Sequence, residues 1–226
     1  KTYYGFGKNN DHIIKEVRYE KRKVSYTIDG ENIRIKVIGN HNILNTSAAY
    51  IAAKELKIST DNFNESLKTF YGVNRRLELK FENGIKVYDD YAHHPTEVRA
   101  SLEGIKKSHQ GRIITIFQPH LYTRTRDFYE EFGKSFEETD ILFLMKIYPA
   151  REEAIEGVTS ELILEEYLKS GKKGRYIESR NELLTELENI MEDGDVIIFQ
   201  GAGDVTILCN EFVKKIKFKI IGEVPL

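Results

Sequence analysis

The chain is poor in residues that mark several classes of protein. It has one cysteine, Cys209, no tryptophan and four prolines in 226 residues. A single cysteine excludes an intrachain disulfide and fits a reducing compartment, so we expect a cytoplasmic protein. No apolar run approaches the roughly 20 residues of a membrane-spanning helix, and we expect neither membrane insertion nor a signal peptide.

A strong excess of one charge is also absent. The 34 Lys and Arg residues nearly balance the 36 Asp and Glu residues, for a net charge of -2 at pH 7. Nucleic-acid-binding proteins usually carry a basic excess, so we expect no nucleic-acid partner, although a local cationic pocket for phosphates stays open. With 40% hydrophobic residues, the composition is that of a globular protein of one large or two small domains. It leaves the oligomeric state open.

The first third of the sequence predicts a hairpin and two helices. Residues 23–39 alternate in polarity around a turn at Asp29-Gly30. Apolar residues recur at helical spacing over 40–58, and a second helix is predicted over 61–70 with Asp61 as its N-cap. These elements are too small for an independent core, so we expect residues 1–73 to be an incomplete domain.

Residues 74–226 predict a second domain, with an α/β fold. Two strands come first, over 76–81 and 84–90, and strands and helices then alternate strictly, as parallel strands require. The continuous apolar runs IITIF, ILFLM and VIIF are typical of strands buried on both faces. We therefore predict a mainly parallel sheet whose helices span residues 95–107, 124–138, 159–169, 180–191 and 203–216.

Unusual polar residues gather where these strands end. In an open parallel sheet, ligands bind outside the carboxyl ends of the strands. The sequence does not give the strand order, so it leaves open which of these loops meet. The residues at the strand ends are Asp89, Asp90, Tyr91, His93 and His94, then Gln118, His120, Tyr122, Thr123, Arg124 and Arg126, then Lys146, Tyr148 and Arg151, and finally Gly201, Gly203 and Asp204.

The stretch DDYAHHPTE (89–97) combines a helix start with residues that a helix start does not need. Pro95 suits the first helical turn and Glu97 suits the positive end of the helix. Capping does not explain two aspartates beside two histidines. A zinc or iron site is one alternative, but adjacent histidines usually point in different directions, so a shared ion is the weaker one.

The stretch QPHLYTRTRD (118–127) offers three donors for an anion, His120, Arg124 and Arg126. An arginine fork can bind a carboxylate or phosphate through two hydrogen bonds. The alternative is a solvated helical turn whose arginines pair with neighbouring carboxylates. Arg124 lies next to the strand end, which favours anion binding for it. For Arg126, anion binding and pairing with neighbouring carboxylates stand equally.

Other motifs carry weaker signals. FQGAGDV (199–205) lacks the third glycine of a dinucleotide fingerprint, because residue 206 is Thr, and the sequence contains no P-loop. Asn40 or Asn42 is expected to cap the helix that starts in NHNILN. The Arg75-Arg76 pair either binds a phosphate or lies on the surface.

Taken together, NHNILNTSAAYIAA, FYGVNRRLE, VYDDYAHHPTE, FQPHLYTRTRDF, YPAREE and DVIIFQGAGD resemble the Mur ligases of bacterial cell-wall synthesis. The resemblance implies that residues 1–73 are the C-terminal part of the family's central ATP-binding domain. Residues 74–226 would be its Rossmann-like C-terminal ligase domain. The P-loop and the protein ligands of Mg²⁺ precede these parts in the family, so this chain is expected to be inactive alone.

The resemblance also implies the reaction and its partners. ATP, with Mg²⁺, phosphorylates the carboxylate of UDP-N-acetylmuramate, and the amine of L-alanine attacks the acyl phosphate. By resemblance, Asn42 and Asn45 contact the adenine, Arg76 the phosphates and Asp90 the ribose. Tyr91, His93, His120 and Arg124 line the alanine and acyl-phosphate site, and His93, His120 and Arg124 are the expected catalytic residues. Leu121 stands where many members have a basic residue, so Arg126 or a histidine would supply the second carboxylate contact.

Three alternatives remain. A related recycling ligase attaches a tripeptide to the same UDP-sugar, and the intact QPHLYTRT loop favours alanine over it. Asp89, Asp90, His93 and His94 could instead serve a metal-dependent hydrolase, although we assign no metal ligand in this chain. A non-catalytic nucleotide-binding module is the third.

Overall fold

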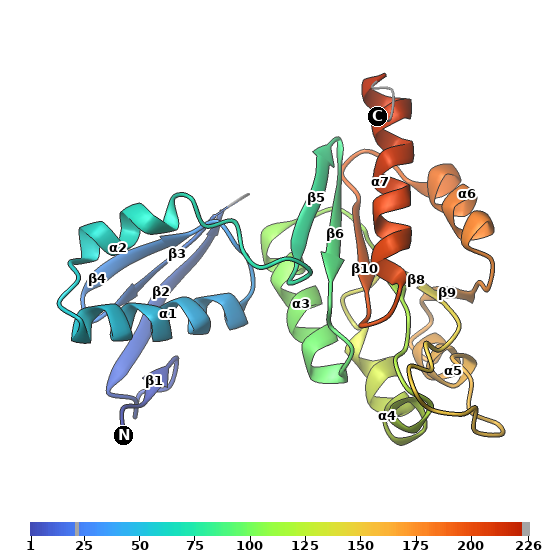
Figure 1. The fold of residues 1–226 in the computed structure, drawn as a ribbon, viewed down its shortest axis with the longest axis horizontal. Coiled ribbons are helices and arrows are strands. Elements are labelled where there is room, and N and C mark those ends of the chain that lie inside the picture. Colours follow the sequence, from blue (N-terminus) through green and yellow to red (C-terminus); the bar gives the residue numbers. More distant parts are fainter. Residues whose placement is uncertain (21–22, 223–226) are drawn as a thin grey trace. The chain divides into compact units, whose positions relative to one another are not determined.

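The computed structural model describes residues 1–20 and 23–222 and divides the chain into two compact units (Figure 1). Unit 1 is Lys1–Val73 with Glu103–His109, and unit 2 is Asn74–Leu102 with Gln110–Leu226. In the described part of the chain, no helix combines the length and apolarity needed to cross a membrane.

Unit 1 contains a four-stranded sheet in the order β1-β2-β3-β4. The predicted hairpin is confirmed, because β3 and β4 pair antiparallel around Asp29 and Gly30. Both turn residues have positive φ, 53° and 80°, as a two-residue hairpin turn favours. Strands β1 and β2 were not predicted as separate elements. The elements are β1 (Tyr4–Gly5), β2 (His12–Glu20), β3 (Lys23–Ile28), β4 (Glu31–Ile35), α1 (Asn40–Glu55) and α2 (Thr60–Leu67).

The two helix caps predicted in unit 1 are wrong. Helix α1 begins at Asn40 itself, with Gly39 as N-cap at φ 99°, and the Asn42 side chain instead donates to Ile38 O at 2.8 Å. Helix α2 is capped by Ser59, whose hydroxyl accepts from Asn62 N at 3.3 Å. Asp61 lies in the first turn, where its carboxylate still favours the positive helix end.

Unit 2 contains a six-stranded sheet in the order β5-β6-β10-β7-β8-β9. β5 is antiparallel to β6 and every other pairing is parallel, which confirms the α/β fold with a mainly parallel sheet. The strands are β5 (Glu78–Asn83), β6 (Ile85–Asp90), β7 (Ile113–Phe117), β8 (Ile141–Leu144), β9 (Lys173–Tyr176) and β10 (Val196–Gln200). The helices are α3 (Pro95–Ser108), α4 (Tyr122–Ser135), α5 (Glu161–Leu168), α6 (Arg180–Ile190) and α7 (Val205–Ile221).

Helices cover both faces of this sheet. On one face, Val87, Ile116 and Phe199 form a buried cluster with Leu187 of α6 and Phe212 of α7. Helix α7 contacts both β6 and β10 and runs beside β10 in Figure 1. On the other face, Phe117 contacts Phe132 of α4 and Phe136, the C-cap of that helix, and Phe136 meets Tyr167 of α5. This two-sided burial explains the continuous apolar runs of β7 and β10.

The strand order determines which loops meet. β10 comes last in the chain but lies between β6 and β7, with Gln200 level with Asp90 on one side and Phe117 on the other. The chain runs on to α7 after β10 and to α4 after β7, which are helices on opposite faces. Ligands bind at such a switch in strand order. The loops after β6, β10 and β7 therefore share one edge of the sheet.

Candidate functional site

A row of aromatic rings runs along the carboxyl edge of the unit 2 sheet. The rings of Tyr91 and His93 meet edge to face, with centroids 5.2 Å apart, and His93 meets His120 in the same way at 5.8 Å. His120 in turn stacks on Tyr148 at 5.7 Å with an interplanar angle of 14°. The structure thus brings the loops after β6, β7 and β8 together at these four rings.

The hydrogen bonding of His93 defines its proton position. Its Nδ1 lies 2.8 Å from the carbonyl oxygen of Tyr91. A carbonyl accepts and cannot donate, so Nδ1 carries the proton, and the lone pair of neutral His93 lies on Nε2. Glu97 accepts from the His93 backbone N–H at 3.1 Å, which ties this residue to the first turn of α3. His93 therefore presents a hydrogen-bond acceptor.

His120 has the opposite arrangement. Arg124 Nη1 lies 3.3 Å from His120 Nδ1, and because a guanidinium has no acceptor, Nδ1 is the acceptor and the ring proton is on Nε2. Burial lowers the pKa of His120 below its ordinary value, and the positive charge of Arg124 lowers it further. His120 is therefore neutral at pH 7 and presents an N–H donor.

The loop after β8 holds the His120 loop in place. Leu121 is the N-cap of α4 at φ 76°, a strained conformation for a leucine, and its N–H donates to Tyr148 O at 3.0 Å. Glu152 accepts from Thr123 N at 3.0 Å and from the Thr123 hydroxyl at 2.5 Å. These two bonds lower the pKa of Glu152, so it is a carboxylate at the positive end of α4. The sequence prediction missed Glu152.

A cavity of about 300 Å³ adjoins this edge, and Tyr148 is part of its wall. Asp204 accepts from Gln118 Nε2 at 2.7 Å and pairs with Arg180. Lys146 and Glu178, 3.4 Å apart, complete the charged lining. A larger hollow of about 530 Å³ in unit 1, along β4 and α2, contains none of the predicted site residues.

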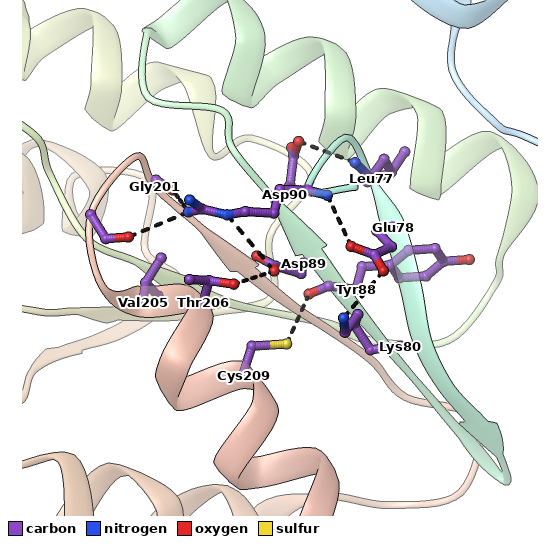
Figure 2. Close-up of polar contacts among 12 residues, drawn as sticks. Leu77, Glu78, Lys80, Tyr88, Asp89, Asp90, Gly201, Val205, Thr206 and Cys209 are labelled. Carbon is purple, nitrogen blue, oxygen red and sulfur yellow. Dashed lines mark hydrogen bonds and ion pairs between the residues drawn. The ribbon is translucent and has the colours of Figure 1, made fainter. Parts of the chain in front are cut away.

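Asp89 and Asp90 are both buried and serve different partners (Figure 2). Asp90 accepts from Leu77 N at 3.2 Å and from Gln200 Nε2 at 3.0 Å. Asp89 accepts from the Thr206 hydroxyl at 2.6 Å. Burial raises the pKa of Asp89 above its ordinary value, against the lowering effects of Thr206 and Arg75.

The structure does not assemble the alternative metal site. Within residues 1–20 and 23–222, no group of three or more His, Cys, Asp or Glu side chains could hold a metal ion. His94 points away from His93, since its ring packs on Phe128 at 5.1 Å and its Nδ1 accepts from Thr96 N at 3.4 Å. Pro95 starts α3 and Glu97 lies in its first turn, as predicted. This arrangement does not favour a metal-dependent hydrolase that would use Asp89, Asp90, His93 and His94.

The arginines at the site differ in their surroundings. Arg124 is partly buried beside His120. Arg126 is 53% exposed and pairs with Asp127 at 2.7 Å, so the structure does not place it with the rings. Arg76 is 51% exposed, lies 3.8 Å from Glu97, and has its guanidinium 5.6 Å from the centre of the Tyr91 ring. Arg75, which the sequence left with Arg76 as either a phosphate contact or a surface arginine, points inward and is 26% exposed.

Two glycines let the β10 loop pass close to the β7 loop. A Cβ at Gly201, where φ is 147°, would lie 2.7 Å from Gln118 O. At Gly203 it would lie 2.6 Å from the Tyr148 ring and 2.5 Å from Gln118 Oε1. The weak glycine motif of the sequence thus serves close packing of backbone and rings.

The remaining predicted site residues belong to unit 1. Asn42 and Asn45 lie three residues apart on α1, so both face the same side of that helix. Asn42 is half-buried and Asn45 is exposed.

Comparison with known proteins places this geometry in a family. The family described as "Mur ligase, glutamate ligase domain" matches residues 75–203. A UDP-N-acetylmuramate–L-alanine ligase from Cytophaga hutchinsonii is 43% identical over 221 residues, covering 95% of this chain and 46% of that protein. The chain spans about half the length of the curated relatives it matches.

Solved structures agree with this assignment. The crystal structure of a UDP-N-acetylmuramate–alanine ligase from Thermotoga maritima has a TM-score of 0.80 and 25% identity, and covers 97% of this chain and 48% of that one. A MurF ligase from the same organism, in complex with ADP, shares the fold with a TM-score of 0.71 and 18% identity, covering 96% and 49% of the two chains. The family match takes in more than half of the chain, which therefore belongs to the Mur ligase family.

Proposed function

We propose that this chain is part of an ADP-forming ligase that joins L-alanine to UDP-N-acetylmuramate in peptidoglycan synthesis. The observation that carries the proposal is the pair of opposite imidazoles, a bare Nε2 on His93 beside an Nε2–H on His120, next to the Arg124 guanidinium. The relatives named for this reaction, one of them 43% identical, support the choice of substrates. A ligase with these substrates would work in the cytoplasm, where ATP and the UDP-sugar are made.

The reaction has two steps. A carboxylate oxygen of the sugar attacks the γ-phosphorus of ATP, ADP leaves, and an acyl phosphate forms. The alanine amine then attacks the acyl carbon, loses a proton, and phosphate leaves with the former carboxylate oxygen. The barrier to both steps is lowered mainly by positioning the reactants and neutralising charge.

The ring row, formed by Tyr91, His93, His120 and Tyr148, suits the second step, in which the amine attacks the acyl phosphate. We assign His93 Nε2 to accept the amine proton, a general-base role worth roughly 10²–10⁴-fold in rate. His120 Nε2–H donates to the oxyanion of the tetrahedral intermediate, as a neutral donor fixed in advance. Arg124 binds the carboxylate of the amino acid, and the Tyr91 ring forms the wall beside His93. Arg126, more exposed, is assigned a secondary contact with that carboxylate.

We assign ATP contacts to four further residues. Asn42 and Asn45 would bind the adenine, Arg76 the phosphates and Asp90 a ribose hydroxyl. Asp90 is 3% exposed and already accepts two hydrogen bonds, but each carboxylate oxygen retains accepting capacity. In this proposal, residues 1–73 are the C-terminal part of the central ATP-binding domain and residues 74–226 are the ligase domain.

Mg²⁺ would accompany ATP and balance its phosphate charge. Mg²⁺ usually takes one or two carboxylates together with waters and the phosphates themselves, and on the family resemblance we propose that these protein ligands lie outside residues 1–226. The P-loop, which the sequence lacks, would lie there as well.

The test is a product assay on the protein encoded by the complete reading frame around this sequence. With ATP and UDP-N-acetylmuramate, we expect L-alanine to give ADP, phosphate and the alanyl product, and a tripeptide to give far less. Preference for the tripeptide would assign the recycling reaction instead. Residues 1–226 alone should give no turnover, and robust ligation by this chain would refute its assignment as a part of the enzyme.

A further inference from the structure

The ring row is closed into a loop by one side chain, Arg75. At one end of the row, the Arg75 guanidinium lies 4.8 Å from the centre of the Tyr91 ring. At the other end, the Tyr148 ring packs against Gly203, where a Cβ would come within 2.6 Å of it. Arg75 Nη2 donates to Gly203 O at 3.4 Å and to Gly201 O at 2.8 Å. The same side chain therefore reaches both ends of the row.

The main chain of Arg75 holds Tyr91 as well. Arg75 O accepts from Tyr91 N at 2.7 Å. The Tyr91 carbonyl, 2.8 Å from His93 Nδ1, accepts the proton that His93 carries there, and the Glu97 carboxylate lies farther from the same nitrogen, at 3.5 Å. Arg75 thus contacts Tyr91 through both its backbone carbonyl and its guanidinium, and the Tyr91 carbonyl in turn accepts from His93 Nδ1.

The buried carboxylate of Asp89 lies beside the Arg75 guanidinium. Arg75 Nε lies 3.9 Å from Asp89 Oδ2, and Asp89 is 1% exposed. Among the described side chains, Arg75 Nε and Asp89 Oδ1 are buried without a hydrogen-bond partner. Figure 2 shows the Asp89 carboxylate beside the Thr206 hydroxyl at the start of α7, from which it accepts at 2.6 Å.

The conformation around Arg75 is costly in backbone energy. Arg75 has φ 57° and Leu77 has φ 51°, a region that side chains other than glycine rarely adopt. Glu78 accepts from Arg75 N at 2.9 Å and so helps to hold the turn. Backbone strain persists where the surroundings fix it, and it clusters at functional sites.

We propose that Arg75 is a positioning residue for the ligase reaction, which keeps the Tyr91 carbonyl in place and thereby keeps the proton of the neutral His93 ring on Nδ1, with the Nε2 lone pair aimed at the amine. The proposal rests on the proposed function for the role of His93. It divides the arginine pair, with Arg76 facing outward toward the phosphates and Arg75 facing inward. Arg75 touches neither substrate in this assignment.

The first test reads the tautomer directly and needs no enzyme activity. In the 226-residue chain, the ¹⁵N shifts of His93 distinguish a proton on Nδ1 from one on Nε2. We expect the wild type to carry it on Nδ1, and Arg75→Met to shift the neutral population toward Nε2. Arg75→Lys keeps a cation over Tyr91 but lacks the fork, so its shift should be intermediate. If Arg75→Met does not fold, the His93 tautomer is compared between the wild type and Arg75→Lys.

Arg175→Met is the matched control, because Arg175 is 49% exposed and pairs with Glu182 and Glu186 on α6. It should leave the His93 shifts unchanged. Unchanged His93 tautomers in the two Arg75 variants would overturn the proposal, whatever their thermal stability.

The second test separates positioning from the proposed function. In the complete protein, Arg75→Met should lower kcat about 10-fold or more, a part of the general-base contribution, with the KM for ATP within about 2-fold. A shifted tautomer in a protein that forms no alanyl product would uphold the positioning role and reject the ligase assignment. A ligase with unaltered kcat in Arg75→Met would reject the positioning role alone.

Discussion

The rings of His93 and His120 meet edge to face 5.8 Å apart and carry their protons on opposite atoms. The Tyr91 carbonyl holds the His93 proton on Nδ1, and the Arg124 guanidinium leaves the His120 proton on Nε2. One ring therefore offers a lone pair and its neighbour offers a donor. Two neutral imidazoles can offer an acceptor and a donor side by side because their hydrogen-bond partners select opposite tautomers.

The pKa of His120 should depend on Arg124. Replacing Arg124 by Met removes a positive charge beside the ring, so the His120 pKa should rise toward the ordinary value of about 6.5. An NMR titration of the histidine ring protons measures it. Arg126→Met, on the same helix but paired with Asp127, is the control and should leave the titration unchanged. A His120 pKa that falls in Arg124→Met would contradict this account of the site.

The same depressed pKa predicts a pH dependence of stability. The folded state binds the His120 proton less tightly than the unfolded state does, so stability falls as pH drops below about 6.5 and levels off below the folded pKa. His120→Asn should flatten this part of the curve. Urea unfolding of both proteins from pH 5 to pH 8 measures the difference, and parallel curves would show that His120 contributes nothing to it.

Arg124 should govern the affinity for the amino acid. Arg124→Lys replaces a two-pronged contact by a point charge, so in the complete protein the KM for L-alanine should rise about 10-fold or more. The KM for ATP should stay within about 2-fold. Arg126→Lys should have the smaller effect on alanine, because Arg126 is 53% exposed. Steady-state kinetics with each substrate varied in turn measures these KM values. A larger rise in the KM for L-alanine in Arg126→Lys than in Arg124→Lys would make Arg126 the main contact and contradict the prediction.

A buried ion pair at the opposite edge of the sheet should contribute to stability without affecting the site. Arg112 donates to Asp195 from Nε at 2.9 Å and from Nη2 at 2.7 Å, and the Asp195 side chain is 3% exposed. Arg112→Met leaves that carboxylate with the backbone donor of Glu192. The expected loss is about 2–3 kcal/mol, below the usual cost of breaking a buried pair because Arg112 is 36% exposed.

The control for that measurement is Arg175→Met, whose ion pairs are exposed and should change stability by less than about 1 kcal/mol. Urea unfolding gives both values. Equal losses in the two variants would mean that burial of Asp195 adds nothing to the strength of its pair.

Sequence patterns predicted most of the unit 2 elements because each pattern reports a local environment. The runs IITIF and VIIFQ are buried at every position, as strands between two helical layers must be. Pro95 and Glu97 marked the start of α3 correctly. Short-range preferences decide these features, so a single sequence suffices for them.

Features that depend on distant contacts were not predictable. The insertion of β10 between β6 and β7 follows from long-range strand pairing, and it decides that Gly203 meets Tyr148. Glu152 caps α4 from 29 residues away. The sequence left the Arg75-Arg76 pair between phosphate binding and the surface, and only the fold shows that Arg75 reaches Gly201, 126 residues along the chain.

We expect a ligase built on this domain to work through an acyl phosphate, and transfer of isotope from the substrate carboxylate to the released phosphate measures this. UDP-N-acetylmuramate labelled with ¹⁸O in its carboxylate is incubated with ATP, L-alanine and the complete protein, and the phosphate released is analysed by mass spectrometry. One labelled oxygen should appear in each phosphate, because the carboxylate oxygen that attacks ATP leaves with the phosphate. Unlabelled phosphate alongside an alanyl product, or phosphate whose oxygen comes from water, would contradict the account.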